Sequence, residues 1–317
     1  MDVHFEPAVK LIDCFEELLA RHNISIPQNA NTGDDMLSMW QILKFMRDPT
    51  LARPKDERPL LSAGAAMFDL AAKVCAVKDG PQFPLLLPHL KLLSEGAVHL
   101  DKQPEYLPDT YNKLIEIYWA CLAMAAGIEV ELDHPQKSRG GVDVTTKALP
   151  GPFTYEMKTL RSPRPRTTFE TIEKAISQIE TAAAKTGAVL LHLTPRIDTK
   201  AIWRDGPSFP DWETPATIMS QQMYDVVQSM INAEGIEAIE GLFAGKKAAP
   251  LVVCVAFGMA SCIHPVLRVP TATPLKVLLT VEMPVARASA PLLMEEIKNL
   301  HRQMQVIGLS AQTSTSI

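Results

Sequence analysis

The stretch Val142–Leu160, VDVTTKALPGPFTYEMKTL, decides the fold that this sequence predicts. Two short runs within it, Val142–Thr145 and Phe153–Leu160, are rich in the β-branched and aromatic residues that favour strands. Between them lies Leu149–Pro152, LPGP, whose proline and glycine residues are typical of a turn. We therefore expect two consecutive strands that pair as a hairpin.

The second of these strands carries an acid and a base on one side. Residues two apart in a strand face the same way, so Glu156 and Lys158 project together. Pairing of the two strands would bring Asp143 close to Glu156. Two neighbouring carboxylates repel each other unless a divalent cation lies between them, and carboxylates are ligands that Mg²⁺ prefers. Lys158 would then orient or deprotonate an attacking water, or stabilise the charge that develops.

The elements on either side extend the pattern. Residues 110–126 form a predicted helix that Gly127 ends, and residues 128–132 alternate as a strand does. After the two strands come a predicted helix at 167–185 and an apolar strand at 189–193. In this last strand we expect His192 to be a core residue. The predicted order is helix, three strands, helix, strand.

With Glu116 in the first helix, Asp143 in a strand and Glu156-Met157-Lys158 in the next strand, residues 109–195 resemble the PD-(D/E)XK restriction-endonuclease-like nuclease superfamily. The resemblance implies an α/β fold with a restriction-endonuclease-like mixed sheet flanked by helices. It implies that Asp143 and Glu156 are metal ligands, that Lys158 is the catalytic lysine, and that Glu116 supports the metal or its water.

The sequence matches the usual pattern of the family at some further positions and departs from it at others. Many members carry a glutamine on the second helix, which implies a catalytic role for Gln178. No tyrosine follows Gln178 by four residues, so the exonuclease-like variant is not supported, and Val142 stands where the family nominally has proline. A Glu-x-Lys after an Asp is common by chance. The alternative interpretation is a surface strand with a Glu–Lys pair and an unrelated Asp in a turn.

Charge is concentrated around the predicted site. The chain has a net charge of −5, yet residues 136–200 hold 11 Lys or Arg against 6 Asp or Glu, a balance of +5. Arg161, Arg164 and Arg166 follow the Glu156 strand directly, and arginines beside a carboxylate centre suit binding to the phosphate backbone. We expect these three arginines to contact nucleic acid. The alternative is an ordinary solvated loop.

The 317 residues suggest two parts. Residues 1–100 show helical periodicity and form a predicted N-terminal helical region, which would recognise a protein partner, substrate or inhibitor. Residues 109–317 would hold the nuclease domain with a C-terminal extension. That extension includes predicted strands at 251–257 and 275–282, and the boundary is expected near residues 99–108.

Several classes of protein are disfavoured. The five cysteines are scattered and odd in number, which indicates reduced thiols rather than a disulfide framework or a structural zinc site. The first residues lack an apolar leader. The uncharged stretch 248–267 contains the short β-branched run Leu251–Phe257, so a buried strand is expected there and not a membrane span. We expect a cytoplasmic protein without a membrane partner.

These features predict a nucleic-acid phosphodiesterase that depends on Mg²⁺, with Mn²⁺ as a substitute. DNA is favoured over RNA as substrate, and endonuclease action is favoured, with restriction, defence, repair and toxin roles all open. A homodimer is compatible with the sequence. Two alternatives stay open: a non-catalytic nucleic-acid-binding or interaction module with the same fold, and a structural α/β protein.

Overall fold

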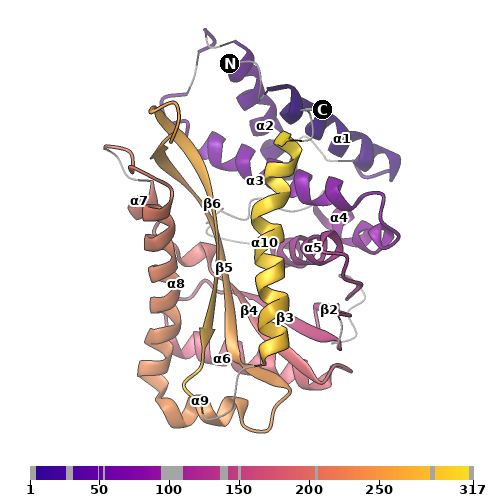
Figure 1. Ribbon diagram of the computed structural model, residues 1–317, viewed down its shortest axis with the longest axis vertical. Coiled ribbons are helices and arrows are strands. Elements are labelled where there is room, and N and C mark those ends of the chain that lie inside the picture. The colour runs from indigo at the N-terminus through magenta and orange to yellow at the C-terminus, as the bar shows by residue number, and fades with distance from the viewer. Residues whose placement is uncertain are drawn as a thin grey trace. The chain divides into compact units, whose positions relative to one another are not determined.

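The computed structural model of the chain is a mixed α/β structure (Figure 1). Its six strands form one mixed sheet in the order β1-β2-β3-β4-β5-β6, with helices on its faces. This confirms the predicted α/β class. The structure describes the following residues: 5–25, 31–48, 50–52, 54–93, 110–135, 142–148, 151–203, 206–285 and 290–313. The predicted domain boundary at 99–108 lies outside these ranges, as do the first two residues of the predicted turn at 149–152.

The contacts within the chain define two compact units. Unit 1 comprises Met1–Gln136 with Asn299–Ile317, and unit 2 comprises Lys137–Lys298. Unit 1 is mainly helical, as the sequence predicts for its first hundred residues, and α3 packs against α1, α2 and α5. Its elements are α1 (Phe5–Arg21), α2 (Asn31–Arg47), α3 (Arg58–Val77), the 3₁₀ helix η2 (Phe83–Leu86), α4 (Leu87–Leu93), α5 (Thr110–Ala125) and the short strand β1 (Val130–Leu132).

Within the described part of the chain, α3 is the one helix that is both long enough and apolar enough to be compared with a membrane span. By length and composition alone it would reach across a membrane, and half of its most apolar window is buried inside the protein.

Gly127, at φ +75°, follows α5 as expected for a residue that ends a helix.

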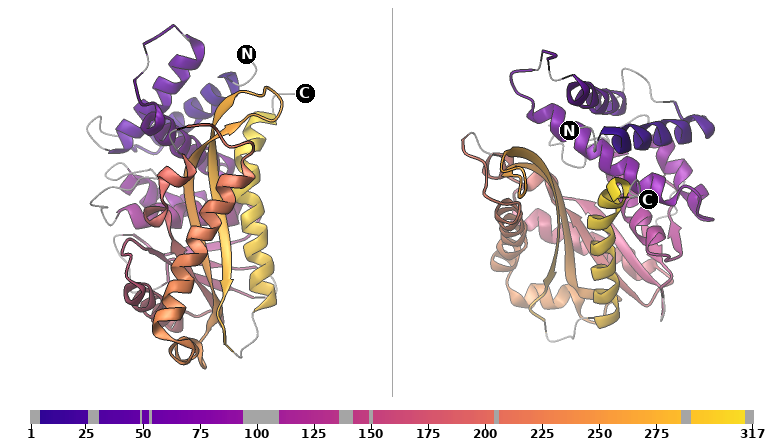
Figure 2. Two further views of the ribbon diagram at one scale, coloured as in Figure 1. Left: turned by 90° about the vertical axis from the view of Figure 1, so that its left-hand side faces the viewer. Right: turned by 45° about the horizontal axis from the view of Figure 1, so that its top comes forward.

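Unit 2 holds the predicted hairpin and the strands that follow it. Strands β2 and β3 pair antiparallel, β4 lies parallel to both β3 and β5, and β6 returns antiparallel to β5. The long β5–β6 hairpin is visible in both views of Figure 2. The strands are β2 (Val144–Thr146), β3 (Phe153–Thr159), β4 (Thr186–His192), β5 (Ala248–Ile263) and β6 (Pro270–Glu282). The strand predicted at 251–257 is therefore confirmed, within a longer strand.

Helices cover the sheet of unit 2. Helix α6 connects β3 to β4, which confirms the predicted order of helix, three strands, helix and strand. Gly235, at φ +85°, separates α8 from α9, a short helix that the sequence analysis did not predict. The helices are α6 (Pro165–Thr181), the 3₁₀ turn η3 (Thr194–Arg196), α7 (Thr199–Ile202), α8 (Glu213–Glu234), α9 (Ile236–Phe243) and the last helix α10 (Pro291–Thr313).

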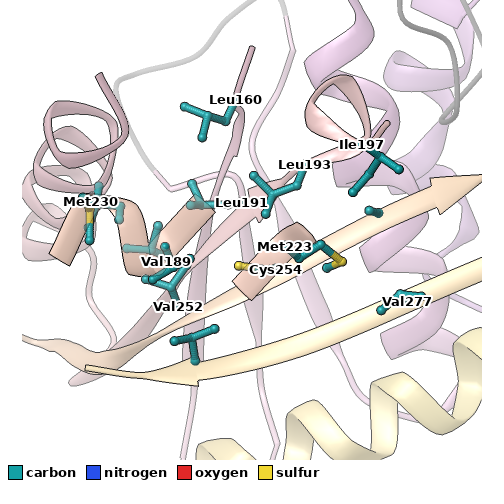
Figure 3. Close-up of a cluster of buried hydrophobic side chains, with 14 of the residues drawn as sticks. Leu160, Val189, Leu191, Leu193, Ile197, Met223, Met230, Val252, Cys254 and Val277 are labelled. Atoms are coloured by element: carbon teal, nitrogen blue, oxygen red, sulfur yellow. The ribbon is translucent and has the colours of Figure 1, made fainter. Parts of the chain in front are cut away.

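One hydrophobic cluster joins α6 and α8 to the sheet. The alternate residues Val189 and Leu191 of β4 face it, together with Val252 of β5 and Met223 and Met230 of α8 (Figure 3). The opposite face of β4 is also buried, which explains why its sequence is a nearly continuous apolar run. A central parallel strand covered on both faces fixes the position of its neighbour β3, which carries the predicted site.

Gly187 at the start of β4 tests this packing. A Cβ atom there would lie 2.4 Å from Thr154 Oγ1 and 2.7 Å from Ile179 Cγ2. We expect Gly187→Ala to lower the free energy of unfolding by about 1–3 kcal/mol, because the overlap forces neighbours to shift. Gly241→Ala in α9 is the matched control: a Cβ there meets open space, and alanine favours the helix by up to ~1 kcal/mol. Urea unfolding followed by circular dichroism measures both, and equal stabilities would contradict the packing.

Candidate functional site

The β2–β3 hairpin places the two predicted carboxylates opposite each other. The register pairs Val144 with Tyr155 and Thr146 with Phe153, and continuing it by one residue sets Asp143 across from Glu156. Asp143 Oδ2 also accepts a hydrogen bond of 2.8 Å from the backbone N–H of Met157. The predicted hairpin is thus confirmed, and it holds Asp143 against the strand segment that bears Glu156.

Lys158 contacts Glu156 along the strand. Its Nζ lies 2.5 Å from Glu156 Oε1, as the same-face spacing predicts. The Glu156 side chain has no exposed surface, whereas Lys158 is 28% exposed. Among the residues that the structure describes, no hydrogen-bond donor reaches Glu156 Oε2. The site therefore combines a buried acid that has one free oxygen with a base that reaches solvent.

Burial controls the ionisation of Glu156. It raises the pKa of this carboxyl from 4.5 to about 7, with a further rise from the neighbouring Asp143 charge. The ammonium of Lys158 opposes the shift by its charge and its hydrogen bond. Close to neutral pH, Glu156 is therefore poised between a neutral and a charged state.

The site faces the α6 side of the sheet. Glu156 lies beside Val189 and Lys158 beside Leu191 in the parallel register, so these side chains share one face. This is the face covered by α6 and α8. Because α6 begins at Pro165, only a short loop separates the carboxyl end of β3 from the helix.

That loop carries the predicted arginines. Arg161 and Arg164 are exposed. Arg166, in the first turn of α6, is 61% exposed and forms ion pairs of 3.0 Å with Glu170 and 2.8 Å with Glu234. The pair with Glu170 is exposed on both sides and contributes little to stability, whereas Glu234 is only 15% exposed. The role of the three arginines in nucleic-acid binding stays a prediction.

Arg196 is a further cation near this loop, and the sequence analysis did not single it out. Its guanidinium donates a hydrogen bond to the carbonyl of Ser162, and burial lowers its pKa. Together with Pro163 and Pro165 it lines a pocket of about 400 Å³. Because β3 and β4 are parallel, the residues just after each strand meet at the same edge of the sheet, a relation that no local sequence pattern marks.

Glu116 belongs to unit 1 and is engaged there. Only 2% exposed, it accepts a hydrogen bond of 2.7 Å from Lys113 Nζ, and its Oε2 lies 3.2 Å from His89 Nε2. Burial lowers the pKa of His89 to about 3, with the charge of Lys113 adding to the effect, so His89 is neutral at pH 7. These contacts give Glu116 a structural environment, and its predicted role in supporting a metal stays a prediction.

Gln178 and His192 complete the predicted set. Gln178 lies half-buried on α6, and its backbone carbonyl accepts a hydrogen bond of 2.7 Å from the Thr181 hydroxyl. Its catalytic role stays a prediction. His192 is fully buried, with Nε2 2.8 Å from Thr194 Oγ1 and Nδ1 3.3 Å from Thr159 Oγ1. This confirms that His192 is a core residue.

A second buried carboxylate lies on the other face of the hairpin. The hydroxyl groups of Thr146 and Tyr155 each lie 2.6 Å from Glu296 Oε1, at the start of α10. Burial raises the pKa of Glu296. No local sequence pattern marks this residue, because its partners are 150 and 141 positions away. We interpret this contact as structural: it anchors α10 to β2 and β3.

The donor set fits a hard divalent cation. Asp143 and Glu156 supply carboxylate oxygens, and Glu156 Oε2 is buried without a hydrogen-bond partner in the described part of the chain. Within those same ranges, no cluster of three or more His, Cys, Asp or Glu side chains suited to a metal occurs. Mg²⁺ commonly takes one or two carboxylates and completes its shell with water and substrate phosphate, so two ligands suffice.

The raised pKa of Glu156 predicts a pH dependence of stability. Between pH 4.5 and 7 the folded state holds a proton that the unfolded state has released, so without metal the wild-type protein loses stability as pH rises. We expect the difference in unfolding free energy between Glu156→Gln and wild type to grow by about 3 kcal/mol from pH 4.5 to pH 8. Urea unfolding in EDTA measures it. The control Glu173→Gln, at an exposed site on α6, should show the wild-type dependence of unfolding free energy on pH. If Glu156→Gln shows the same dependence, the pKa of Glu156 is not raised.

Comparison of the chain with protein-family models, with curated proteins and with solved structures finds no match.

Proposed function

We propose that the protein is a metal-dependent nucleic-acid phosphodiesterase with a restriction-endonuclease-like fold, and that DNA is its favoured substrate. The observation that carries the proposal is the grouping of Asp143, Glu156 and Lys158 on one face of the β2–β3 hairpin. An exposed surface strand would not bury both carboxylates, and here Asp143 is 8% exposed and Glu156 is fully covered. This burial favours the proposal over a chance Glu–Lys pair.

Each side chain has a distinct task in the proposed reaction. Asp143 and Glu156 would hold Mg²⁺, which when bound supplies a Lewis acid for the scissile phosphate and for the attacking water. Asp143 is kept in place by the Met157 backbone N–H. Lys158 reaches solvent while touching Glu156, so its ammonium is placed to orient the water and to stabilise negative charge on the phosphate.

The loop after β3 would position the substrate. Arg161 and Arg164 are exposed and follow the end of β3 that bears Lys158, and Arg196 donates a hydrogen bond to the Ser162 carbonyl of this loop. Guanidinium groups bind phosphate oxygens with two parallel hydrogen bonds and without regard to base sequence. This supports binding to the nucleic-acid backbone beside the carboxylates.

Metal binding is the first test. We expect Asp143→Asn and Glu156→Gln each to abolish Mn²⁺ binding measured by calorimetry. For the wild type we expect tighter binding at pH 8 than at pH 6, because the metal requires ionised Glu156, whose pKa is about 7. Glu173→Gln should bind Mn²⁺ as the wild type does. If both site variants retain wild-type affinity, the two carboxylates are not ligands.

Cleavage is the second test. Plasmid, single-stranded DNA and tRNA are incubated with the protein in Mg²⁺, Mn²⁺ or EDTA. We expect Lys158→Ala to lower the rate of cleavage at least ~100-fold, because a charge-stabilising group is lost. Binding to DNA in Ca²⁺ should persist. Lys174→Ala, which removes an exposed lysine of α6, is the control and should cleave normally.

The outcomes separate the candidate functions. A folded Lys158→Ala protein that cleaves at the wild-type rate would contradict the assigned role of the lysine. Wild-type protein that binds metal and DNA but cleaves none of the three substrates would indicate a non-catalytic module with the same fold. Cleavage of tRNA alone would reassign the substrate from DNA to RNA.

A further inference from the structure

Two cysteines of unit 1 face each other between helices α1 and α3. Cys14 Sγ and Cys75 Sγ are 3.2 Å apart, although 61 positions separate the residues in the sequence. Both are free thiols and both are partly exposed, in contrast to the buried Cys121, Cys254 and Cys262. A disulfide bond joins sulfur atoms at about 2.05 Å, so the two sulfurs, now 3.2 Å apart, must approach each other by roughly 1.2 Å to bond.

A lysine distinguishes the two sulfurs. Lys78, just beyond the end of α3, places its Nζ 3.2 Å from Cys14 Sγ. A neighbouring ammonium stabilises a thiolate, and the thiolate is the reactive form of cysteine. Burial and the adjacent Cys14 raise the pKa of Cys75 and outweigh the opposing charge of Lys78, so Cys75 keeps its proton. The arrangement makes Cys14 the nucleophile and Cys75 the thiol that follows.

We propose that Cys14, Cys75 and Lys78 form a redox site that a hydroperoxide oxidises to a Cys14–Cys75 disulfide. The Cys14 thiolate attacks the outer peroxide oxygen, an S–O bond forms, the O–O bond breaks, and the released alkoxide takes a proton to give an alcohol, or water from hydrogen peroxide. The sulfur of Cys75 then attacks the sulfenic sulfur of Cys14. The S–O bond breaks, and hydroxide leaves with the Cys75 proton as water.

The overall change balances. The two thiols lose two electrons and two protons, and the peroxide is reduced by the same two electrons. Cys121 is the alternative partner for Cys75, since it influences the ionisation of Cys75. It is fully buried, however, and burial raises its pKa to about 12. Peroxide and solvent reach the partly exposed Cys14 and Cys75, but they do not reach the fully buried Cys121.

The Cys14–Cys75 disulfide would constrain unit 1. It would link α1 to α3 and enclose the whole of α2 in the loop between Cys14 and Cys75. Closing a loop of this length removes conformational freedom from the unfolded chain. Oxidation should therefore stabilise this helical unit, independently of any activity at Glu156.

The first experiment identifies the bond. The full chain is reduced, treated with hydrogen peroxide, alkylated and digested without reductant, and its peptides are analysed by mass spectrometry. We expect a Cys14–Cys75 linked peptide, and a rise of roughly 10 °C in the midpoint of thermal unfolding that dithiothreitol reverses. A Cys75–Cys121 link, or oxidation of Cys14 to sulfinic acid without any link, would overturn the proposal.

The second experiment assigns the roles. At pH 7, Lys78→Met should slow disulfide formation at least ~5-fold, because the variant lacks the ammonium that contacts Cys14 Sγ. Lys44→Met, at an exposed position of α2, is the matched control and should react at the wild-type rate. Cys75→Ser should let a sulfenic-acid probe label Cys14, and Cys14→Ser should lose the labelling. Equal rates for Lys78→Met and wild type, or undiminished labelling of Cys14→Ser, would overturn the assignment.

Discussion

The buried carboxyl group of Glu156 is the constraint on which the arrangement of the candidate site depends. A carboxylate without exposed surface is costly to ionise, and the charge of Asp143 across the hairpin increases the cost. Lys158 offsets part of it through a contact of 2.5 Å. Glu156 Oε2 remains without a hydrogen-bond partner in the described part of the chain, so a bound proton stabilises this carboxyl group, and in the proposed function a bound cation would do the same. Proton and metal are therefore expected to compete for one oxygen.

The sheet determines what surrounds that carboxyl group. Strands β3 and β4 are parallel, so the segments that follow them begin at the same edge of the sheet. The segment after β3 bears Arg161 and Arg164, and the turn after β4 bears Arg196. Glu156 in β3 and Asp143 just before β2 are both buried, whereas Arg161 and Arg164 are exposed to solvent. This ordering separates opposite charges into a buried layer and an outer layer, and the proposed function would use the outer layer to bind a polyanion.

The sequence predicts local relations well and distant ones poorly. Asp143, Glu156 and Lys158 belong to one hairpin, so strand periodicity and a single turn suffice to group them. Glu296 reaches the same hairpin from 150 residues away, and Arg196 reaches the loop only through the parallel pairing of β4. Neither relation leaves a local pattern, because both depend on the packing of complete helices and strands.

The same limit applies to unit 1 and to side-chain partners. Helical periodicity identified its first hundred residues as helical, yet it gave no sign that Cys14 would meet Cys75 or that Glu116 would pair with His89. Likewise α9 is too short for its periodicity to stand out, and it was missed. Periodicity shows which side of an element is buried, but not what that side touches.

Strand β3 carries a different polar partner on each face. Glu156 points to Asp143 on one side, and Tyr155 donates to Glu296 on the other. A shift of one residue in the β2–β3 pairing would turn every side chain over. It would place Glu156 on the side of Glu296, acid against acid, and set the phenol ring of Tyr155 among the apolar residues beneath α6. The shifted hairpin would therefore be destabilised on both faces. The alternation of Tyr155 and Glu156 thus favours the native register of β2 and β3 over a register shifted by one residue.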